Sequence, residues 1–415
     1  MSLLLLGLFA LFSILGVPVA FAIGAATLTA MHVAGVPPVV LPQQMFSGIN
    51  SFALVAIPMF ILAGDVMARG AVSARLVALA EALIGFVRGG LSVVSVLAGM
   101  FFAAISGSGA ATTAAVSSTL VPELTRKGYD PASAASLIAA SGTIGVVIPP
   151  SVPMIIYAVI AQESVSRLFL NGFLPGLAMG LGLMGIALVQ GYRRAYPAGA
   201  AFRLGTIWRT FRAAFWGLMT PVIILGGIFS GIFTPSEAAV IAVNYAILVS
   251  LFIYRDLGLR DLYHLLIRSA VTTAVIMIVI AASAALSWAL SSWQVPTAIA
   301  RFVLGVSTET WLILALMLLL ILLTGVFIET ASALIILTPI LLPLAVQLGI
   351  DPVHFGIIIV VGLAIGMITP PVAINLYVAS SVTGIGLERI TAAILPYLAM
   401  LILVLIGIAY VPLLF

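Results

Sequence analysis

Long apolar runs, separated by short polar stretches, dominate this chain of 415 residues. A run of about 20 apolar residues is long enough to cross the roughly 30 Å hydrocarbon core of a bilayer as a helix. We therefore predict an all-α polytopic membrane protein with nine full spans. The spans are Leu3–Met31, Ser51–Ala68, Ser133–Ala161, Leu168–Gln190, Phe215–Phe233, Ser236–Tyr254, Ser269–Leu290, Val353–Ser381 and Ile390–Pro412.

Two of these spans contain consecutive prolines. Pro149 and Pro150 interrupt the span at 133–161, and Pro370 and Pro371 interrupt the span at 353–381. Proline removes a backbone donor and clashes with the preceding helical turn. Both spans are therefore predicted to be broken helices.

Two further apolar segments, 89–125 and 310–343, have polar residues at their centres. The first carries "SGSGAATT" (Ser106–Thr113) and the second carries "GVFIETAS" (Gly325–Ser332). The arms of the first segment are shorter than the hydrocarbon core at about 1.5 Å per residue. We predict two re-entrant hairpins whose tips reach the membrane interior.

An internal repeat appears at an offset of 221 residues without a gap. It matches Pro122, Gly128, Asp130, Pro131, Gly145, Pro149, Pro150 and Pro175 with Pro343, Gly349, Asp351, Pro352, Gly366, Pro370, Pro371 and Pro396. Repeat 1 is assigned to 1–192 and repeat 2 to 234–415. The segment 193–233 between them holds a basic cytoplasmic loop and an unpaired linking span.

Arginines orient the spans. Five of them, Arg193, Arg194, Arg203, Arg209 and Arg212, fall in a stretch without acidic residues, and Arg255, Arg260 and Arg268 form a second basic stretch. Cytoplasmic loops are enriched in such residues, so both stretches are expected in the cytoplasm, the N-terminus in the cytoplasm and the C-terminus in the periplasm. Arg69, Arg75 and Arg88 of repeat 1 are also expected in the cytoplasm, and the equivalent stretch of repeat 2 holds only Arg301. Gln347 and Leu348 likewise stand where repeat 1 has Arg126 and Lys127, which favours inverted topology. With Trp208 and Trp216 interleaved, the first stretch is either a solvated loop or an interfacial helix.

Composition excludes several functions. The chain is 63% hydrophobic and 7% charged, which is not typical of a soluble domain. It has no cysteine, and its three histidines lie far apart, so the sequence offers no metal-ligand spacing. Its net charge of +4 indicates orientation in a membrane rather than binding of nucleic acid.

The hairpin tips and helix breaks carry the candidate chemistry. Unwound backbone at this depth exposes carbonyl oxygens, which together with hydroxyls suit Na⁺, while helix N-termini suit an anion. The predicted Na⁺ ligands are Ser106, Ser108, Gly142, Thr143, Gly145, Thr330, Ser332, Gly366 and Thr369. The predicted substrate or coupling residues are Gly109, Pro150, Glu329, Pro371 and Asn375. The alternative is that small residues only permit close helix packing.

Acidic residues in apolar surroundings need separate treatment. Glu329, the repeat equivalent of Ser108, is predicted to neutralise a cation, relay a proton or cap the second hairpin arm. Asp130 and Asp351 each precede proline and are predicted to be helix caps. The role of Asp65 stays open.

The segments "AISGSGAATTAAVSSTLVPELTRKGYDPASAASLIAASGTIGVVIPPSVPMIIYAV", "FIETASALIILTPILLP" and "GMITPPVAINLYVAS" resemble the large membrane subunit of tripartite ATP-independent periplasmic (TRAP) transporters. The resemblance covers nearly the whole chain. It implies an elevator-type, sodium-coupled secondary transporter of the bacterial inner membrane, without catalytic activity or a cofactor other than Na⁺. It also implies a periplasmic binding protein that delivers an organic-acid anion, and a separate small four-helix membrane subunit. The Na⁺ and substrate sites implied by the resemblance fall on Ser106, Ser108, Gly142, Thr143, Thr330, Gly366 and Thr369.

The main alternative is a stand-alone cation-coupled carboxylate symporter or antiporter, since such proteins share inverted hairpin repeats. An intramembrane enzyme is disfavoured, because the sequence offers no paired aspartates in facing spans and no nucleophile–histidine pair. Closed hairpins disfavour a passive channel. The sequence does not name the acid, because neither tip contains an arginine, and Arg301 in the connector is expected to snorkel.

Overall fold

The computed structural model describes residues 1–69, 72–198, 201–295, 297–298, 301, 305 and 309–414. Within them every regular element is a helix, and the only β-type pairing is an isolated bridge between Arg88 and Ala198. The predicted all-α fold is confirmed.

The helices follow one another along the chain with short connections. Their bounds are α1 Ser2–Ile14, α2 Val19–Val33, α3 Val40–Ile49, η1 Phe52–Val55, α4 Ala56–Arg69, α5 Val72–Ile84, α6 Gly90–Ser106, α7 Gly109–Arg126, α8 Pro131–Gly142, η2 Thr143–Val146, α9 Val152–Ala161, α10 Val165–Arg193, α11 Leu204–Phe229, α12 Pro235–Leu248, η3 Val249–Tyr254, α13 Leu259–Ser292, α15 Thr310–Phe327, α16 Thr330–Gln347, α17 Pro352–Gly366, α18 Ile374–Thr383, α19 Leu387–Tyr410 and η4 Val411–Leu414.

Seven described helices are long and apolar enough to cross a membrane, or eight if a pair bent by 63° between α3 and α4 forms one span. This confirms a polytopic membrane protein. The two broken spans fall outside that count because their halves, α8, α9, α17 and α18, contain only 10 to 15 residues each.

Both breaks and both hairpins lie where the sequence placed polar or helix-breaking residues. Helix geometry stops at Val147–Ser151 and at Met367–Ala373, around the two proline pairs. Gly107 and Ser108 join α6 to α7, and Gly107 has a left-handed φ of +60°, which glycine adopts without steric cost. Ile328 and Glu329 join α15 to α16.

The predicted first span, Leu3–Met31, is wrong. The chain forms two helices, α1 and α2, which pack against each other. Gly16, with a φ of +77°, and Pro18, which lacks an amide donor, reverse the chain between them. The prediction of a cytoplasmic N-terminus depended on counting Leu3–Met31 as one membrane span. Because this segment forms two helices, the count of spans no longer supports that prediction.

Three other boundaries differ from the prediction. α13 contains 34 residues and begins at Leu259, so Arg260 and Arg268 lie on a helix and not in a loop. α11 begins at Leu204, so Arg209 and Arg212 also lie on a helix, whereas residues 199–200 of the basic stretch are outside the described residues. The short helix α3 was not predicted, because its ten residues include a proline and four polar or glycine positions.

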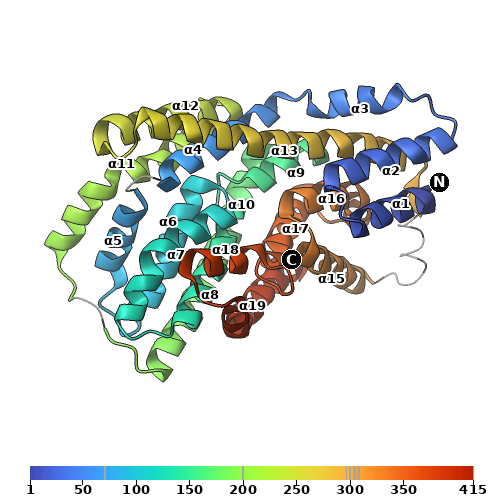
Figure 1. Cartoon of the computed structure of the whole chain (residues 1–415). Helices are drawn as coiled ribbons and strands as arrows, with labels where there is room; N and C mark the ends of the chain where they lie inside the picture. The colour runs from blue at the N-terminus through green and yellow to red at the C-terminus, as the bar shows by residue number, and fades with distance from the viewer. Residues whose placement is uncertain are drawn as a thin grey trace.

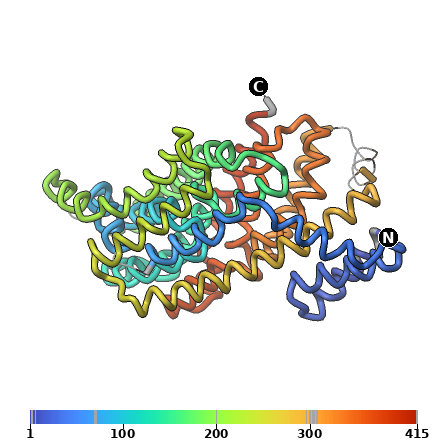
Figure 2. Tube along the Cα trace, turned by 90° about the horizontal axis from the view of Figure 1, so that it is seen from above, coloured from blue at the N-terminus to red at the C-terminus, as the bar shows by residue number. Residues whose placement is uncertain are grey.

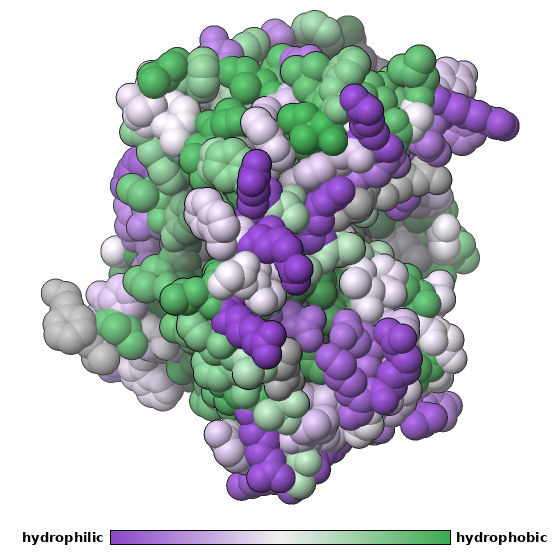
Figure 3. Space-filling model, turned by 90° about the vertical axis from the view of Figure 1, so that its left-hand side faces the viewer, coloured by the Kyte–Doolittle hydropathy of each residue, from purple (hydrophilic) through white to green (hydrophobic). Residues whose placement is uncertain are grey.

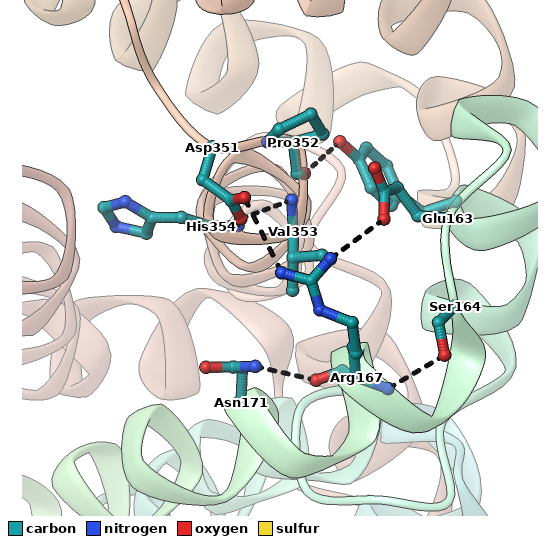
Figure 4. A network of polar contacts seen from close by, with 9 residues as sticks. Glu163, Ser164, Arg167, Asn171, Asp351, Pro352, Val353 and His354 are labelled. Atoms are coloured by element: carbon teal, nitrogen blue, oxygen red, sulfur yellow. Dashed lines mark hydrogen bonds and ion pairs between the residues drawn. The ribbon is translucent and has the colours of Figure 1, made fainter.

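The two halves of the molecule start their broken helices at opposite ends of α10. Arg167, near the start of α10, lies 3.7 Å from the carboxylate of Asp351 at the start of α17 (Figure 4). Arg194, directly after α10, lies 3.6 Å from the carboxylate of Asp130 at the start of α8. Because α10 contains 29 residues, about 43 Å of helix separates the two starts. This opposite placement is what an inverted repeat requires.

Contacts between the halves are reciprocal. α7 packs on α18 as α16 packs on α9, and α8 packs on α19 as α17 packs on α10. A pattern in which each half uses the same elements on the other is the signature of two-fold symmetry. Figures 1 and 2 show α3 and α13 along one edge of this paired bundle. We call the hairpins and broken helices the transport unit, and α3, α4 and α13 the scaffold.

Candidate functional site

The first hairpin tip gathers oxygen atoms. The hydroxyl of Ser106 lies 2.9 Å from that of Thr112, and Thr112 donates a 2.8 Å hydrogen bond to the Ser108 carbonyl oxygen. The side chain of Ser108 accepts from the amide of Ala111 and caps α7. Ser106 and Thr112 are buried, so these oxygens form a hard-oxygen cluster shielded from solvent.

The first helix break lies directly against this cluster. A β-carbon at Gly145 would be 2.7 Å from both the Ser108 carbonyl oxygen and the Thr112 hydroxyl. Only glycine therefore permits the approach. A β-carbon at Gly107 would likewise be 2.7 Å from the carbonyl oxygen of Pro150. The tip is thus in close contact with the break at Gly145 and at Pro150.

Glu329 caps the second hairpin. Its Oε2 accepts hydrogen bonds from the amides of Ala331 at 2.9 Å and Ser332 at 3.1 Å. Among the roles considered for this residue, capping is observed directly, and Ser108 performs the same role in the other repeat. The hydroxyl of Thr330 beside it is buried and has no hydrogen-bond partner.

The predicted convergence of the four irregular elements is observed. Both tips and both breaks border one cavity of about 370 Å³. Five of the predicted site residues line it: Ser106, Ser108, Gly109, Glu329 and Thr330. Val146 contributes from the first break and Met367 from the second.

The scaffold forms the other wall of this cavity. Asp65 of α4 and Arg268 and Thr272 of α13 face the tips. Asp65 accepts a 2.9 Å hydrogen bond from Ser269, which links α4 to α13. The sequence indicated only an orientation role for Arg268 and left the role of Asp65 open, and the structure places both at the cavity.

Asn375 connects the two repeats below the cavity. It is fully buried, its Nδ2 donates to the carbonyl oxygen of Ala139 at 3.3 Å, and its Oδ1 has no partner. A β-carbon at Gly142 would be 3.2 Å from this Nδ2 and would also collide with the Thr113 hydroxyl. Helices next to the two breaks therefore meet, although 236 positions separate Asn375 from Ala139.

The remaining predicted site residues lie outside the cavity. The hydroxyls of Thr143 and Thr369 donate to carbonyl oxygens of their own helices. Gly366 packs on α15, where its β-carbon would be 2.4 Å from the carbonyl carbon of Gly325. Gly142, Gly145, Pro150, Ser332, Pro371 and Asn375 also lie outside the set that lines the cavity.

Comparison with known proteins identifies the family. The family described as "Tripartite ATP-independent periplasmic transporter, DctM component" matches residues 6–414. The chain belongs to this family. It therefore has the fold of a TRAP large permease, and relatives of that kind extend over nearly its full length.

Two relatives illustrate the match. The isethionate TRAP transporter permease protein DctMQ of Oleidesulfovibrio alaskensis is 42% identical over 98% of this chain, and this chain spans 65% of that longer relative. The C4-dicarboxylate TRAP transporter large permease protein DctM of Pseudomonas aeruginosa is 42% identical over 90% of this chain and 87% of its own length. The solved structure of the Alcanivorax borkumensis YdaH transporter superposes with a TM-score of 0.66 at 14% identity, covering 98% of each chain, and supports the fold.

Sequence reasoning did not assign Thr112, Asp65, Arg268 or Thr272 to the site. Thr112 stands within the quoted tip motif, so its spacing from Ser108 could have identified it. Asp65 and Arg268 carry no local signal of this kind, because each lies in a helix far along the chain from either tip.

Proposed function

We propose that this chain is the large permease subunit of a TRAP transporter that drives uptake of an organic-acid anion with a sodium gradient. A periplasmic binding protein delivers the anion, and a small four-helix membrane subunit completes the permease in the bacterial inner membrane. The observation that carries this proposal is the cavity between the two hairpin tips in a chain of the DctM family.

The oxygen cluster of the first tip supports sodium coupling. The hydroxyls of Ser106 and Thr112 and the Ser108 carbonyl lie together, and neutral oxygens of this kind suit a small hard cation. In the second tip, the unpartnered hydroxyl of Thr330 is available for the same purpose beside the carboxylate of Glu329. We assign one Na⁺ to each tip.

Helix N-termini and one guanidinium at the cavity support an anionic substrate, and the carboxylates of Asp65 and Glu329 lie beside them. α7 and α16 both begin at the cavity, so the positive ends of their dipoles point toward it. Arg268 adds a guanidinium, which can bind a carboxylate or sulfonate through two hydrogen bonds. The two relatives above are named for isethionate, a sulfonate, and for C4-dicarboxylate, so their names describe acids of these two kinds.

The spacing of cavities along α13 supports an elevator motion. Arg268, Thr272 and Ile276 face the tips, and the same helical stripe continues through Ile280, Ser283 and Ser287. This second part of the stripe lines another cavity, of about 420 Å³, together with polar residues of α3.

The opposite wall of that second cavity belongs to the transport unit and is mostly apolar, with Val159, Ile160, Ile335 and Pro339. A polar scaffold wall, in which the hydroxyl of Ser283 has no partner, thus faces apolar hairpin and helix arms. A shift of the transport unit by eleven residues of α13, about 16 Å, would bring the polar tips to this polar wall. We propose that these are the two ends of the transport stroke.

The direction of opening follows from the arginines. Arg268 and Asp65 lie toward the ends of α13 and α4 that the positive-inside rule places in the cytoplasm. The site is then open inward, and the C-terminus is periplasmic.

Uptake into proteoliposomes tests the proposal. The chain, reconstituted with its small membrane subunit, should accumulate a radiolabelled organic acid only with an inward sodium gradient and the binding protein. Uptake without the binding protein would instead support the stand-alone symporter. Uptake that is independent of sodium would contradict the coupling.

A further inference from the structure

The first turns of α11 form a surface that the transport mechanism leaves unused. Arg209 and Arg212 are exposed, and no ion pair to either guanidinium is formed within the described part of the chain. Together with Trp208 and Ala213 they line a hollow of about 470 Å³. Figure 3 shows the end of the molecule that carries α5 and α11, with hydrophilic residues gathered across an otherwise apolar face.

The position of this hollow relative to the membrane follows from helix length. α11 contains 26 residues and ends at Phe229. About 20 residues cross the hydrocarbon core, and counting back from Phe229 by that number reaches Arg209. The two arginines therefore lie at the boundary between hydrocarbon and headgroups.

Aromatic groups alternate with the charges along this part of α11. Trp208 is 67% exposed and stacks on Phe211 with a centroid distance of 6.0 Å, and Phe211 in turn contacts Phe215 at 6.1 Å. Tryptophan is enriched at this depth because its ring is apolar and its N–H is polar. A ligand here meets guanidinium groups and aromatic rings together.

The polar end of the surface has an uncompensated positive charge. No acidic residue occurs between Arg193 and Arg212, and the sequence contains no further acid until Glu237. A zwitterionic headgroup would leave this charge only partly neutralised, whereas a headgroup with net negative charge neutralises it.

We propose that Trp208, Arg209 and Arg212 form a binding site for an anionic phospholipid at the cytoplasmic edge of α11. The two guanidiniums bind the headgroup phosphate, the indole packs beside the headgroup, and the acyl chains lie along Phe211 and Phe215. Inorganic phosphate shares the headgroup chemistry but gains nothing from the aromatic rings.

Native mass spectrometry of the purified chain tests this site. The chain is offered phosphatidylglycerol and phosphatidylcholine in equal amounts, and bound lipids are counted. Each arginine near the surface contributes about 1 kcal/mol toward anionic lipid, so the R209Q/R212Q variant should lose roughly 30-fold in its preference for phosphatidylglycerol.

R193Q/R260Q is the matched control, because it removes two exposed arginines from the same side but outside this surface. It should keep the preference, and excess inorganic phosphate should leave the lipid bound. W208A keeps the charges and should weaken binding of the lipid but not of phosphate. The proposal would be overturned if both double variants lost the preference for phosphatidylglycerol equally. It would also be overturned if the unmodified chain bound both lipids equally, or if phosphate displaced the lipid. A size-exclusion profile identical to that of the unmodified chain shows that each variant is folded.

Discussion

At the scale of single residues, hydroxyls and glycines that look alike in sequence have different roles. Ser106 and Thr112 share a buried hydrogen bond at the first tip, whereas the Thr143 hydroxyl is bonded to its own helix. Glu329 is a cap for two amides. The local sequence does not separate these cases, because each role depends on what packs against the side chain.

Replacing Thr112 by valine removes one oxygen from the tip cluster while keeping its volume. Loss of a buried polar partner costs about 1–3 kcal/mol, so the sodium concentration for half-maximal uptake should rise about tenfold. Uptake at a series of sodium concentrations measures this. Thr119→Val is the control, since its hydroxyl bonds only to the Ala115 carbonyl of the same helix. An unchanged sodium dependence in Thr112→Val would remove this residue from the ion site.

Replacing Arg268 by glutamine removes the cationic group that faces the tips. Charge-assisted hydrogen bonds contribute about 1.5–3 kcal/mol, so the KM for the anion should rise at least about tenfold with little change in sodium dependence. Initial uptake rates give both values. Arg260→Gln, on the exposed start of the same helix, should leave KM unchanged. If both variants have the same KM, Arg268 does not bind the substrate.

At the scale of elements, close backbone contacts determine how the broken helices sit on the hairpins. α17 crosses α15 at Gly366, where a β-carbon would be 2.4 Å from the carbonyl carbon of Gly325. The repeat partner of Gly366 is Gly145, which is equally close to its hairpin but meets the tip itself, at the Ser108 carbonyl oxygen and the Thr112 hydroxyl. Both glycines were predicted as ion ligands, and their observed contacts are those of close packing.

Gly366→Ala should therefore destabilise the protein. Forcing a methyl group into backbone contact costs about 1–3 kcal/mol, so the Tm measured in detergent should fall by several degrees. Gly407→Ala on α19 is the matched control, because its β-carbon would meet nothing within 4 Å. Helix propensity predicts an unchanged or higher Tm for that variant. Equal stability of the two variants would contradict the packing role.

The two cavities along α13 predict where the second hairpin travels. The chain has no cysteine, so paired cysteines need no altered background. Ala331→Cys should cross-link to Ile276→Cys in the state described, because both residues line the same cavity. With sodium gradient and binding protein present, Ala331→Cys should also cross-link to Ser283→Cys.

Ala285→Cys serves as the control for that experiment. It lies only two residues from Ser283 but on another, fully buried face of α13. If no cross-link between Ala331→Cys and Ser283→Cys forms during active uptake, the 16 Å stroke is refuted. The proposal that the chain transports its substrate would not be affected. Cross-links of equal yield to both positions would show that the stripe does not guide the motion.

At the scale of the whole molecule, the antiparallel start of α8 and α17 predicts which faces are accessible. Lys127 lies in the connection between α7 and α8, and Gln347 ends α16, shortly before α17. Cysteines at these positions should react from opposite sides of the membrane when an impermeant maleimide is added to intact cells. Only Gln347→Cys should be labelled from outside, and labelling of both from one side would reject the inverted topology.

Much of the fold could be predicted because its signals are local. Double prolines end helices wherever they occur, and the 221-residue repeat places the second break and hairpin once the first are recognised. The prediction of the first span was wrong for a local reason too. Gly16 and Pro18 lie inside an apolar run that hydropathy alone treats as continuous. The predicted length of α13 was too short, because the first turns of this helix are polar enough to resemble a loop.

The sequence by itself determined the membrane setting, the hairpins, the broken helices and the repeat, because apolar length and helix-breaking residues act within a few turns of chain. Only the tertiary structure decided which residues share the site. Arg268 and Asp65 reach the tips, and Asn375 reaches Ala139, through packing of helices that are distant in sequence. Such contacts depend on how helix faces fit together in space, and no pattern along one segment encodes them.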